Sequence, residues 1–131
     1  MNAWKTFSTR DAGLIAALFT EDAEWIAPAG NATALALEHT DHMIGPDQIA
    51  CFIAGEMHRL FSQIEISFRG IHADGDTVTV EERMRATLPG GRPYDNDHCF
   101  VFVVSGDRIR QVREYMDTRI GWRMIFETGA D

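Results

Sequence analysis

Apolar residues repeat at helical spacing in the first half of this chain. The first two predicted helices carry apolar positions three or four residues apart: Trp4 and Phe7, then Leu14, Ile15, Leu18 and Phe19. A third helix is predicted to begin at Gly45-Pro46-Asp47, because proline suits the first helical position and an acid suits the positive end of the helix dipole. Its apolar stripe consists of Ile49, Phe52, Ile53, Met57, Leu60 and Phe61. Such stripes indicate helices that pack against a core.

The second half of the chain changes to the alternation typical of strands. Four long strands are predicted, at 64–73, 77–88, 94–104 and 108–117, and glycine-containing turns join them. A shorter strand is predicted at 23–27, and residues 29–43 give few signals beyond a strand fragment at 34–37. Helices followed by strands predict one α+β domain over residues 1–131, and four long strands joined by glycine turns predict a strongly curved antiparallel meander on which the helices pack.

Charged and hydrogen-bonding residues fall on alternating positions of three of these strands. They are Glu81 and Arg83, then Asn96 and His98, then Glu114. Alternate residues of a strand share one face, so the five side chains could meet in one cavity if the strands pair as a meander. There Arg83 would hold one carboxylate ionised, and His98 would serve as the partner acid or as a donor to the ligand.

A second interpretation of the same residues is a surface one. Glu81, Arg83 and Arg85 on one strand face could form a solvated stripe with cross-strand ion pairs. His98 beside Asp97 could be a structural hydrogen bonder instead of a catalyst. The sequence leaves both interpretations open.

Composition and charge exclude several classes of partner. The 131 residues are 45 % hydrophobic, enough for a sizeable core, and the formal net charge of −8 would repel nucleic acid and anionic lipid. We find no membrane-spanning stretch and no signal peptide, which predicts a cytoplasmic protein.

Cys51 and Cys99 are predicted to be buried free thiols. The stretch 38–42 has metal-ligand residue types in a weak pattern, so neither a metal nor another cofactor is expected.

Three segments carry a resemblance to a known family. They are residues 19–25 before Pro28, the helix opening at 44–49, and the C-terminal run from 106–109 through 112–118. They resemble the SnoaL-like branch of the nuclear transport factor 2-like superfamily, which includes ketosteroid isomerases and limonene epoxide hydrolases. The resemblance implies a cone-shaped α+β barrel of the cystatin-like type, in which the curved sheet wraps around the N-terminal helices. It also implies a pocket at the open mouth of the barrel and a homodimer formed through the outer sheet face.

Compared position by position, the resemblance argues against ketosteroid isomerase chemistry. The general base of those enzymes corresponds to Ala27, the acidic oxyanion donor to Phe100, and the first-helix tyrosine falls near Ala3. Without these groups the enolate oxygen would lose its main stabilising contacts. We therefore predict that the protein is not a true ketosteroid isomerase.

The similarity to limonene epoxide hydrolases is less regular but more suggestive of chemistry. Their acid–arginine–acid set corresponds to Glu81, Arg83 and Glu114, with the first two exchanged in order, and their water-holding polar pair is replaced by Trp25 and Ala27. A central guanidinium can bind two carboxylates from either position. The resemblance thus implies that Glu81, Arg83 and Glu114 could form an acid–arginine–acid set inside the pocket.

These observations predict a protein that binds a small molecule and acts on it without a cofactor. The expected reaction class is that of an isomerase, a lyase or cyclase, or a hydrolase. The predicted catalytic residues are Glu81, Arg83, His98 and Glu114, and the predicted ligand-binding residues are Trp25, Asn96, Phe100, Phe102 and Met116. The expected ligand is a small apolar or aromatic metabolite. The alternative is a non-catalytic ligand-binding or dimerisation domain of the same fold.

Overall fold

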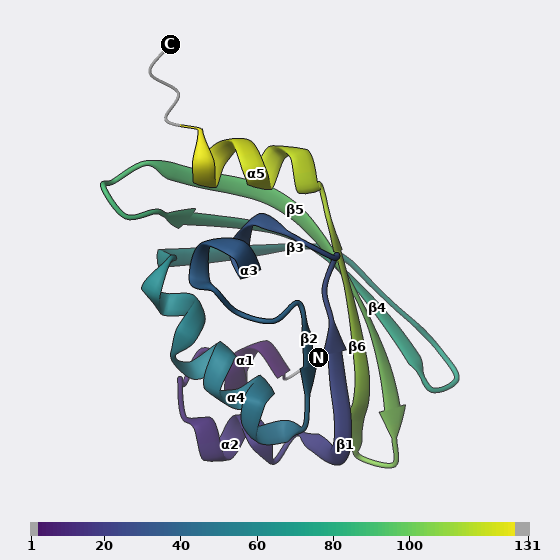
Figure 1. The fold of residues 1–131 in the computed structure, drawn as a ribbon. Helices are drawn as coiled ribbons and strands as arrows, with labels where there is room; N and C mark the ends of the chain where they lie inside the picture. Colours follow the sequence, from purple (N-terminus) through teal and green to yellow (C-terminus); the bar gives the residue numbers. More distant parts are fainter. Residues whose placement is uncertain (1–2, 128–131) are drawn as a thin grey trace.

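A curved sheet wraps around a group of short helices (Figure 1). The computed structural model describes residues 3–127, which form six strands in the order β2-β1-β6-β5-β4-β3. Their bounds are Phe19–Ile26 for β1, His42–Ile44 for β2, Ser62–Asp74 for β3, Thr77–Thr87 for β4, Pro93–Ser105 for β5 and Arg108–Met116 for β6. The α+β architecture is confirmed, and the four long strands lie close to their predicted bounds. The first two and last four residues of the predicted domain lie outside the described residues.

The sheet differs from the predicted one in being mixed and open. Strand β1 pairs parallel to β6, whereas the other neighbouring strands pair antiparallel. The parallel pair arises because the chain passes through α3, α4 and four further strands between β1 and β6, and then returns in the same direction. The edges are β2 and β3, so the sheet does not close into a complete barrel.

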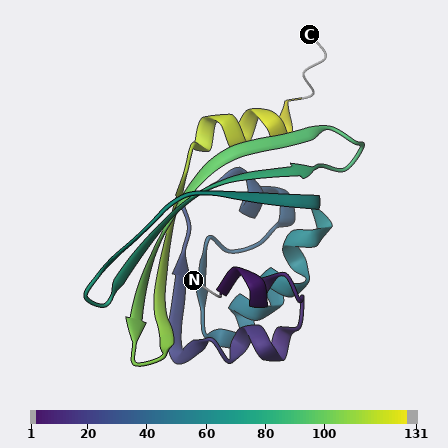
Figure 2. The same ribbon diagram turned by 180° about the vertical axis from the view of Figure 1, so that it is seen from behind.

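Five helices and one 3-10 turn complete the described part of the chain. They are α1 Ala3–Phe7, α2 Ala12–Ala16, α3 Ala32–Leu37, α4 Pro46–Ala54, η1 Glu56–Arg59 and α5 Thr118–Phe126. Figures 1 and 2 show α1 to α4 gathered on the concave side of the sheet, with α5 lying along β5 at one end. Within residues 3–127, no helix has both the length and the apolar character needed to cross a membrane.

Three helix bounds correct the sequence prediction. The predicted strand fragment at 34–37 is part of α3, because the side chain of Asn31 accepts a hydrogen bond from the Ala34 N–H and caps that helix. The second helix ends at Ala16, and Phe19 begins β1 instead of extending the helical stripe. The long helix predicted from residue 45 ends at Ala54 and continues as the η1 turn after Gly55.

The register of the β4–β5 hairpin decides which residues face the helices. Thr87 pairs with Pro93, and every further pair keeps partners of the same parity, so Glu82 lies opposite His98. The even-numbered residues of both strands are buried from Val80 to Ala86 on β4 and from Tyr94 to Phe102 on β5. Odd-numbered positions therefore face the outer side of the sheet.

Helix α5, which the sequence pattern did not predict, is held at both ends. The side chain of Asp117 accepts a hydrogen bond from the Ile120 N–H at the first turn. At the other end, Arg92 donates to the carbonyls of Met124 and Ile125. Gly121 lies against Asn96 of β5, where an added Cβ would be 3.5 Å from the amide nitrogen. This contact fixes α5 over one end of the concave face.

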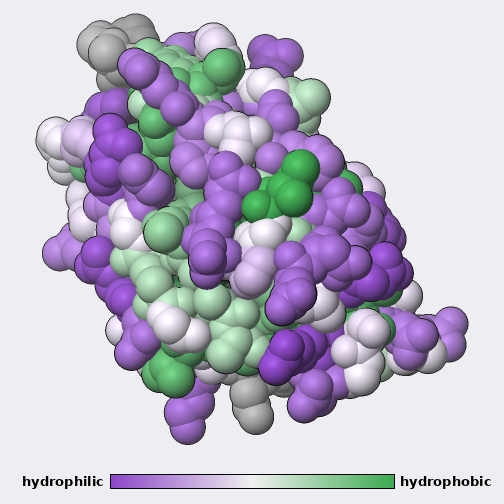
Figure 3. Space-filling model, turned by 60° about the horizontal axis from the view of Figure 1, so that its bottom comes forward, coloured by the Kyte–Doolittle hydropathy of each residue, from purple (hydrophilic) through white to green (hydrophobic). Residues whose placement is uncertain are grey.

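The surface on the helix side is not uniformly polar. Figure 3 shows a broad area of pale green, mildly apolar residues bordered by purple hydrophilic ones. Large apolar side chains are also exposed in the described part of the chain, including Leu14 of α2 and Ile44 of β2. Such scattered exposure is common on folded proteins and carries no functional argument alone.

Candidate functional site

A cavity of about 430 Å³ lies between the concave face of the sheet and the helices. This volume is in the range of known small-molecule sites. Most of its wall is apolar, and aromatic rings come from α1, β1, α4 and β5. The principal apolar lining residues are Trp4, Phe7, Trp25, Ala27, Met43, Phe52, Ile53, Met57, Phe61, Ile64, Ile66, Met84, Phe100 and Met116. A flat, largely hydrocarbon ligand would bury most of its surface here.

Three ionisable side chains enter this apolar cavity from neighbouring strands. Glu82 lies on β4, His98 on β5 and Glu114 on β6, and all three line the cavity. The register places Glu82 opposite His98 and Phe100 opposite Glu114, so the three positions are adjacent on one sheet face. Because charges are costly in an apolar cavity, this cluster is the strongest candidate for chemistry.

Glu82 is the member of this cluster whose burial is least compensated. Its residue is 3 % exposed, and Oε2 has no hydrogen-bond partner among residues 3–127. Burial raises the pKa of Glu82 to about 7, although the charge of His98 and the indole of Trp4 oppose that change and Glu114 adds to it. A carboxyl group with this pKa exchanges protons readily near neutral pH.

Glu114 is held by two partners. Its Oε1 accepts a hydrogen bond from Nε1 of Trp25 at 2.9 Å, and its Oε2 lies 3.4 Å from Nδ1 of His98. Burial lowers the pKa of His98, but its hydrogen bond and charge interaction with Glu114, together with the charge of Glu82, outweigh burial and raise it overall. Glu114 and His98 therefore form a close pair, in which Glu114 favours the charged form of His98.

Two further buried residues, Tyr94 and Asn96, form hydrogen bonds that lead to His98. The hydroxyl of Tyr94 is 3.2 Å from Nε2 of His98, and Nδ2 of Asn96 donates to that hydroxyl at 3.3 Å and to the carbonyl of Asp117 at 3.1 Å. Burial raises the pKa of Tyr94 to about 12, although the hydrogen bond from Asn96 partly offsets it. Tyr94 is therefore a neutral hydroxyl at physiological pH.

The structure separates two of the predicted catalytic residues from the other two. Glu81 and Arg83 are on the outer face of β4, and neither lines the cavity. The placement predicted for them is corrected by the hairpin register, which puts odd positions of β4 on the face opposite His98.

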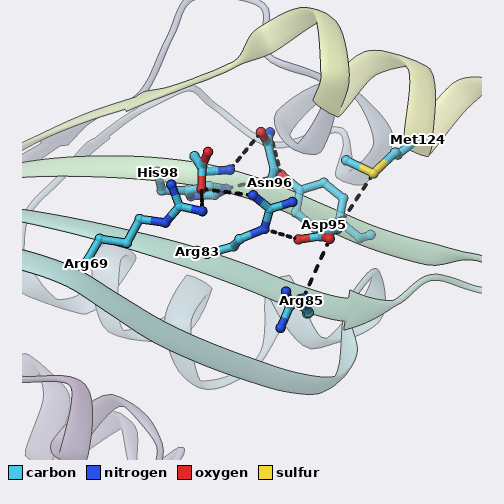
Figure 4. A network of polar contacts seen from close by, with 9 residues as sticks. Arg69, Arg83, Arg85, Asp95, Asn96, His98 and Met124 are labelled. Atoms are coloured by element: carbon cyan, nitrogen blue, oxygen red, sulfur yellow. Dashed lines mark hydrogen bonds and ion pairs between the residues drawn. The ribbon is translucent and has the colours of Figure 1, made fainter.

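The outer face of the hairpin carries a network of ion pairs instead. Nε of Arg83 donates to Oδ1 of Asp95 at 2.6 Å, and Arg83 also lies 3.6 Å from Asp97. Arg85 lies 3.6 Å from the second oxygen of Asp95, and Arg69 lies 3.5 Å from Asp97. Figure 4 shows Arg83 and Arg85 beside Asp95. The solvated-stripe interpretation thus describes the position of Arg83 and Arg85 correctly.

The predicted ligand-binding residues divide into wall and core. Trp25, Phe100 and Met116 line the cavity as expected. Phe102 is fully buried in the core beyond it, and Asn96 is buried beneath α5 with its amide bonded to protein groups. These two residues therefore do not reach the cavity space.

Glu82 is the functional candidate that the sequence interpretation missed. It is the one charged residue in the row Val78, Val80, Glu82, Met84, Ala86 and Leu88, which is otherwise apolar. A single charge on the buried face of a strand is itself a signal, because such a charge is tolerated only with partners or with a function. Trp4 and Phe7 of α1 are further wall residues that the helical stripe could have indicated.

The remaining candidate groups lie outside this cluster. Around the stretch 38–42, His42 pairs with Glu24 at 2.7 Å, whereas Asp41 accepts from the Gly30 N–H at 2.9 Å. Among residues 3–127, no three His, Cys, Asp or Glu side chains are grouped to hold a metal ion. Cys51 is exposed and Cys99 is half-buried, so the prediction of two buried thiols is wrong. Both cysteines are free.

Comparisons with known proteins agree with this architecture. Residues 2–112 match the model of the SnoaL-like domain. No curated protein matches the sequence. Among solved structures, an NTF2-like protein of unknown function from Burkholderia pseudomallei has a TM-score of 0.82 at 19 % identity, and the match covers 95 % of this chain and 92 % of that one.

Two other solved structures have informative descriptions. TerC co-crystallized with polyporic acid has a TM-score of 0.79 at 20 % identity, and the match covers 94 % of this chain and 92 % of that one. A candidate SnoaL-like polyketide cyclase from Jannaschia sp. CCS1 has a TM-score of 0.75 at 15 % identity, with 96 % and 90 % covered. At these identities the similarities establish the shared fold.

Proposed function

Because this chain belongs to the SnoaL-like domain family, we propose that its cavity binds a flat, largely apolar metabolite and that Glu82 transfers a proton to or from a carbon atom of it. The reaction would be an isomerisation or a cyclisation that proceeds through an enolate. The observation that carries the proposal is the buried Glu82 carboxyl group, with an oxygen that has no partner among residues 3–127 and a pKa of about 7. A base of this strength is well suited to proton transfer at neutral pH.

The second carboxylate supports this assignment of roles. Two acids in one cavity push their pKa values apart when their environments differ. Glu114 accepts from Trp25 and lies beside His98, whereas Oε2 of Glu82 has no hydrogen-bond partner within the part of the chain that the structure describes. Glu82 is therefore the acid–base group, and the charge of Glu114 helps to raise its pKa.

The donors around the cluster restrict the substrate class. The Trp25 N–H is used by Glu114, and the amide N–H groups of Asn96 are used by Tyr94 and Asp117. Strong stabilisation of an enolate oxygen needs free, preorganised donors. With those donors already engaged, we infer a substrate whose carbon acid is already activated, such as the carbon between two carbonyl groups.

The apolar wall and the structural neighbours agree with such a ligand. Aromatic rings from Trp4, Trp25 and Phe100 line the space beside the cluster. A neighbour of the same fold was co-crystallized with polyporic acid, and another is a candidate polyketide cyclase. Both descriptions support a small organic metabolite as the ligand.

The structure gives less support to a catalytic acid–arginine–acid set like that of epoxide hydrolases, because the arginine of that set, Arg83, lies outside the cavity. Arg83 contacts Asp95 and Asp97 on the outer face, so it does not join Glu114. We expect Arg83→Gln to keep the proton-exchange rate within about twofold of wild type, since the residue touches no cavity group. A loss of more than about tenfold would show that the outer network controls the site.

The proposal can be tested with an aryl 1,3-dicarbonyl probe such as benzoylacetone. We expect the protein to accelerate deuterium exchange at the carbon between the carbonyls above the buffer rate, measured by NMR in D₂O. Binding would be followed by tryptophan fluorescence in a Trp122→Phe background. This substitution removes the tryptophan of α5, so the signal comes from the cavity residues Trp4 and Trp25. Tight binding without accelerated exchange would reject catalysis and support the alternative of a ligand-binding protein.

A homodimer through the outer sheet face and a cytoplasmic location both stay predictions. The outer face near Arg83 carries paired charges from β3, β4 and β5. Sedimentation velocity at two salt concentrations would measure the oligomeric state directly.

A further inference from the structure

The orientation of the Asn96 side chain is fixed by two backbone groups. Its Oδ1 accepts from the N–H of Asp97 at 2.9 Å, and its Nδ2 donates to the carbonyl of Asp117 at 3.1 Å. A backbone N–H can only donate and a carbonyl can only accept, so the amide cannot be reversed. Its remaining N–H therefore donates to the hydroxyl oxygen of Tyr94, 3.3 Å away.

This donation determines where the hydroxyl hydrogen of Tyr94 points. The Tyr94 oxygen already accepts from Asn96, and its other hydrogen-bond neighbour within residues 3–127 is Nε2 of His98 at 3.2 Å. Tyr94 is 1 % exposed and Asn96 is 2 % exposed, so bulk water does not supply another acceptor. The hydroxyl hydrogen is then directed at Nε2 of His98, which must accept it.

From this chain of contacts we infer that Asn96 and Tyr94 fix the neutral tautomer of His98 with its proton on Nδ1, and thereby direct that N–H at Glu114. Nδ1 lies 3.4 Å from Oε2 of Glu114. A histidine whose two ring nitrogens are distinguished by their partners keeps one tautomer and one ring orientation. The positioning residues Tyr94 and Asn96 act through His98 and do not touch the ligand.

The charged groups around His98 oppose the effect of the hydrogen bonds that run from Asn96 through Tyr94 to His98, because they favour its charged form. Glu82 on β4, Glu114 on β6 and Asp97 on β5 all favour a charged imidazolium. If His98 became protonated on Nε2, that N–H would point at a Tyr94 oxygen that already accepts from Asn96. The hydroxyl hydrogen would then lose its acceptor, which is costly for a buried group. Asn96 and Tyr94 therefore limit how far the carboxylates can charge His98.

The consequence for the site concerns which group exchanges protons with the ligand. This consequence, unlike the tautomer itself, rests on the proposed function. Both nitrogens of His98 are engaged by protein partners, whereas Oε2 of Glu82 has none among residues 3–127. His98 is therefore a positioning residue for Glu114, and Glu82 is the group that meets the ligand.

The tautomer can be measured in the ligand-free protein without any assay of turnover. We expect long-range ¹H–¹⁵N NMR of histidine-labelled protein, recorded above the pKa of His98, to show a protonated Nδ1 and a hydrogen-bonded, unprotonated Nε2. His98→Gln assigns the signals among the five histidines. A neutral His98 protonated on Nε2 overturns the inference, whatever the exchange assay gives.

Two variants test the individual links of the chain. In Tyr94→Phe the Nε2 resonance should move downfield toward that of an unbonded nitrogen, and an unmoved resonance would show that Tyr94 is not the donor. In Asn96→Ala the amide no longer fixes the Tyr94 hydroxyl, so its hydrogen can turn away from Nε2 and the pKa of His98 should rise. An unchanged pKa would show that Asn96 does not act on His98. His72→Gln, an exposed histidine of β3, serves as the matched control and should leave both readouts unchanged.

Discussion

Glu82→Gln is expected to lower the rate of probe exchange by about 10²–10⁴-fold, the usual contribution of a general base. The amide keeps the size of the side chain but cannot take up a proton. Apolar contacts dominate the cavity wall, so the affinity for the probe should change by less than about threefold. The measurement is the pseudo-first-order rate of deuterium uptake at saturating probe, with the dissociation constant obtained separately by fluorescence.

Glu81→Gln is the matched control for this experiment. It removes the same charge from the neighbouring position of β4, but on the outer, exposed face, where Glu81 lies 4.0 Å from His72. The control should retain the wild-type rate. Equal losses in the two variants would indicate a general charge effect and would contradict the role of Glu82. Loss in Glu81→Gln alone would restore the original placement of the acid.

The rate of deuterium exchange should also depend on pH in a defined direction. Glu82 must be ionised to act as a base, so the wild-type rate should rise as pH increases through about 7. This rise should be absent from any residual exchange by Glu82→Gln.

Local sequence patterns were enough to predict most of the strands of this protein. The alternation of β4 and β5, the turns that contain Gly75 and Gly106, and the helix that begins at Pro46 all appear near the expected positions. These features depend on local backbone preferences and on one-sided burial, which a single sequence records directly. The family resemblance added the expectation that the curved sheet wraps around the helices.

The elements that were missed or mistaken depend on tertiary contacts. Strand β2 has three residues and exists through its pairing with β1. Helix α5 depends on the Asp117 cap and on Arg92, which lies in the β4–β5 turn and donates to its carbonyls. Residues 34–37 look like a strand because Leu35 and Leu37 alternate with alanine, yet the Asn31 cap makes them helical.

The error at the site was one of parity. Glu81 and Arg83 were selected because two charged groups on one strand face suggested chemistry, although the five-residue connection between Thr87 and Pro93 places even positions of β4 beside His98. On the other two strands, His98 and Glu114 were correctly placed in the cavity. A shift of one residue exchanges the two faces of a strand, so the pattern placed Glu81 and Arg83 in the cavity, whereas the structure places them on the outer face.

Glu82→Gln is also expected to stabilise the protein above neutral pH, by about 3 kcal/mol, since one pKa unit corresponds to about 1.4 kcal/mol. The pKa of Glu82 is raised from 4.5 to about 7 in the folded chain. Between these two values the folded state holds a proton that the unfolded state has released. The free energy of unfolding of the wild type therefore falls as pH rises from about 4.5 to about 7. Glutamine mimics the protonated acid and avoids this loss.

The sign of the effect separates a functional Glu82 from a structural one. We expect equal stabilities of wild type and variant near pH 4 and a more stable variant at pH 8, measured by urea unfolding at each pH. His98, whose pKa is also raised, contributes a loss of stability of the same sign as pH rises through its folded pKa. The charge of Glu82 is one cause of that raised pKa, so this loss is smaller in Glu82→Gln and adds to the expected difference. A variant that is less stable at pH 8 would mean that the Glu82 carboxylate is satisfied within the fold. A variant that is both more stable and inactive would show that the protein retains a destabilising buried carboxyl group because its reaction requires one.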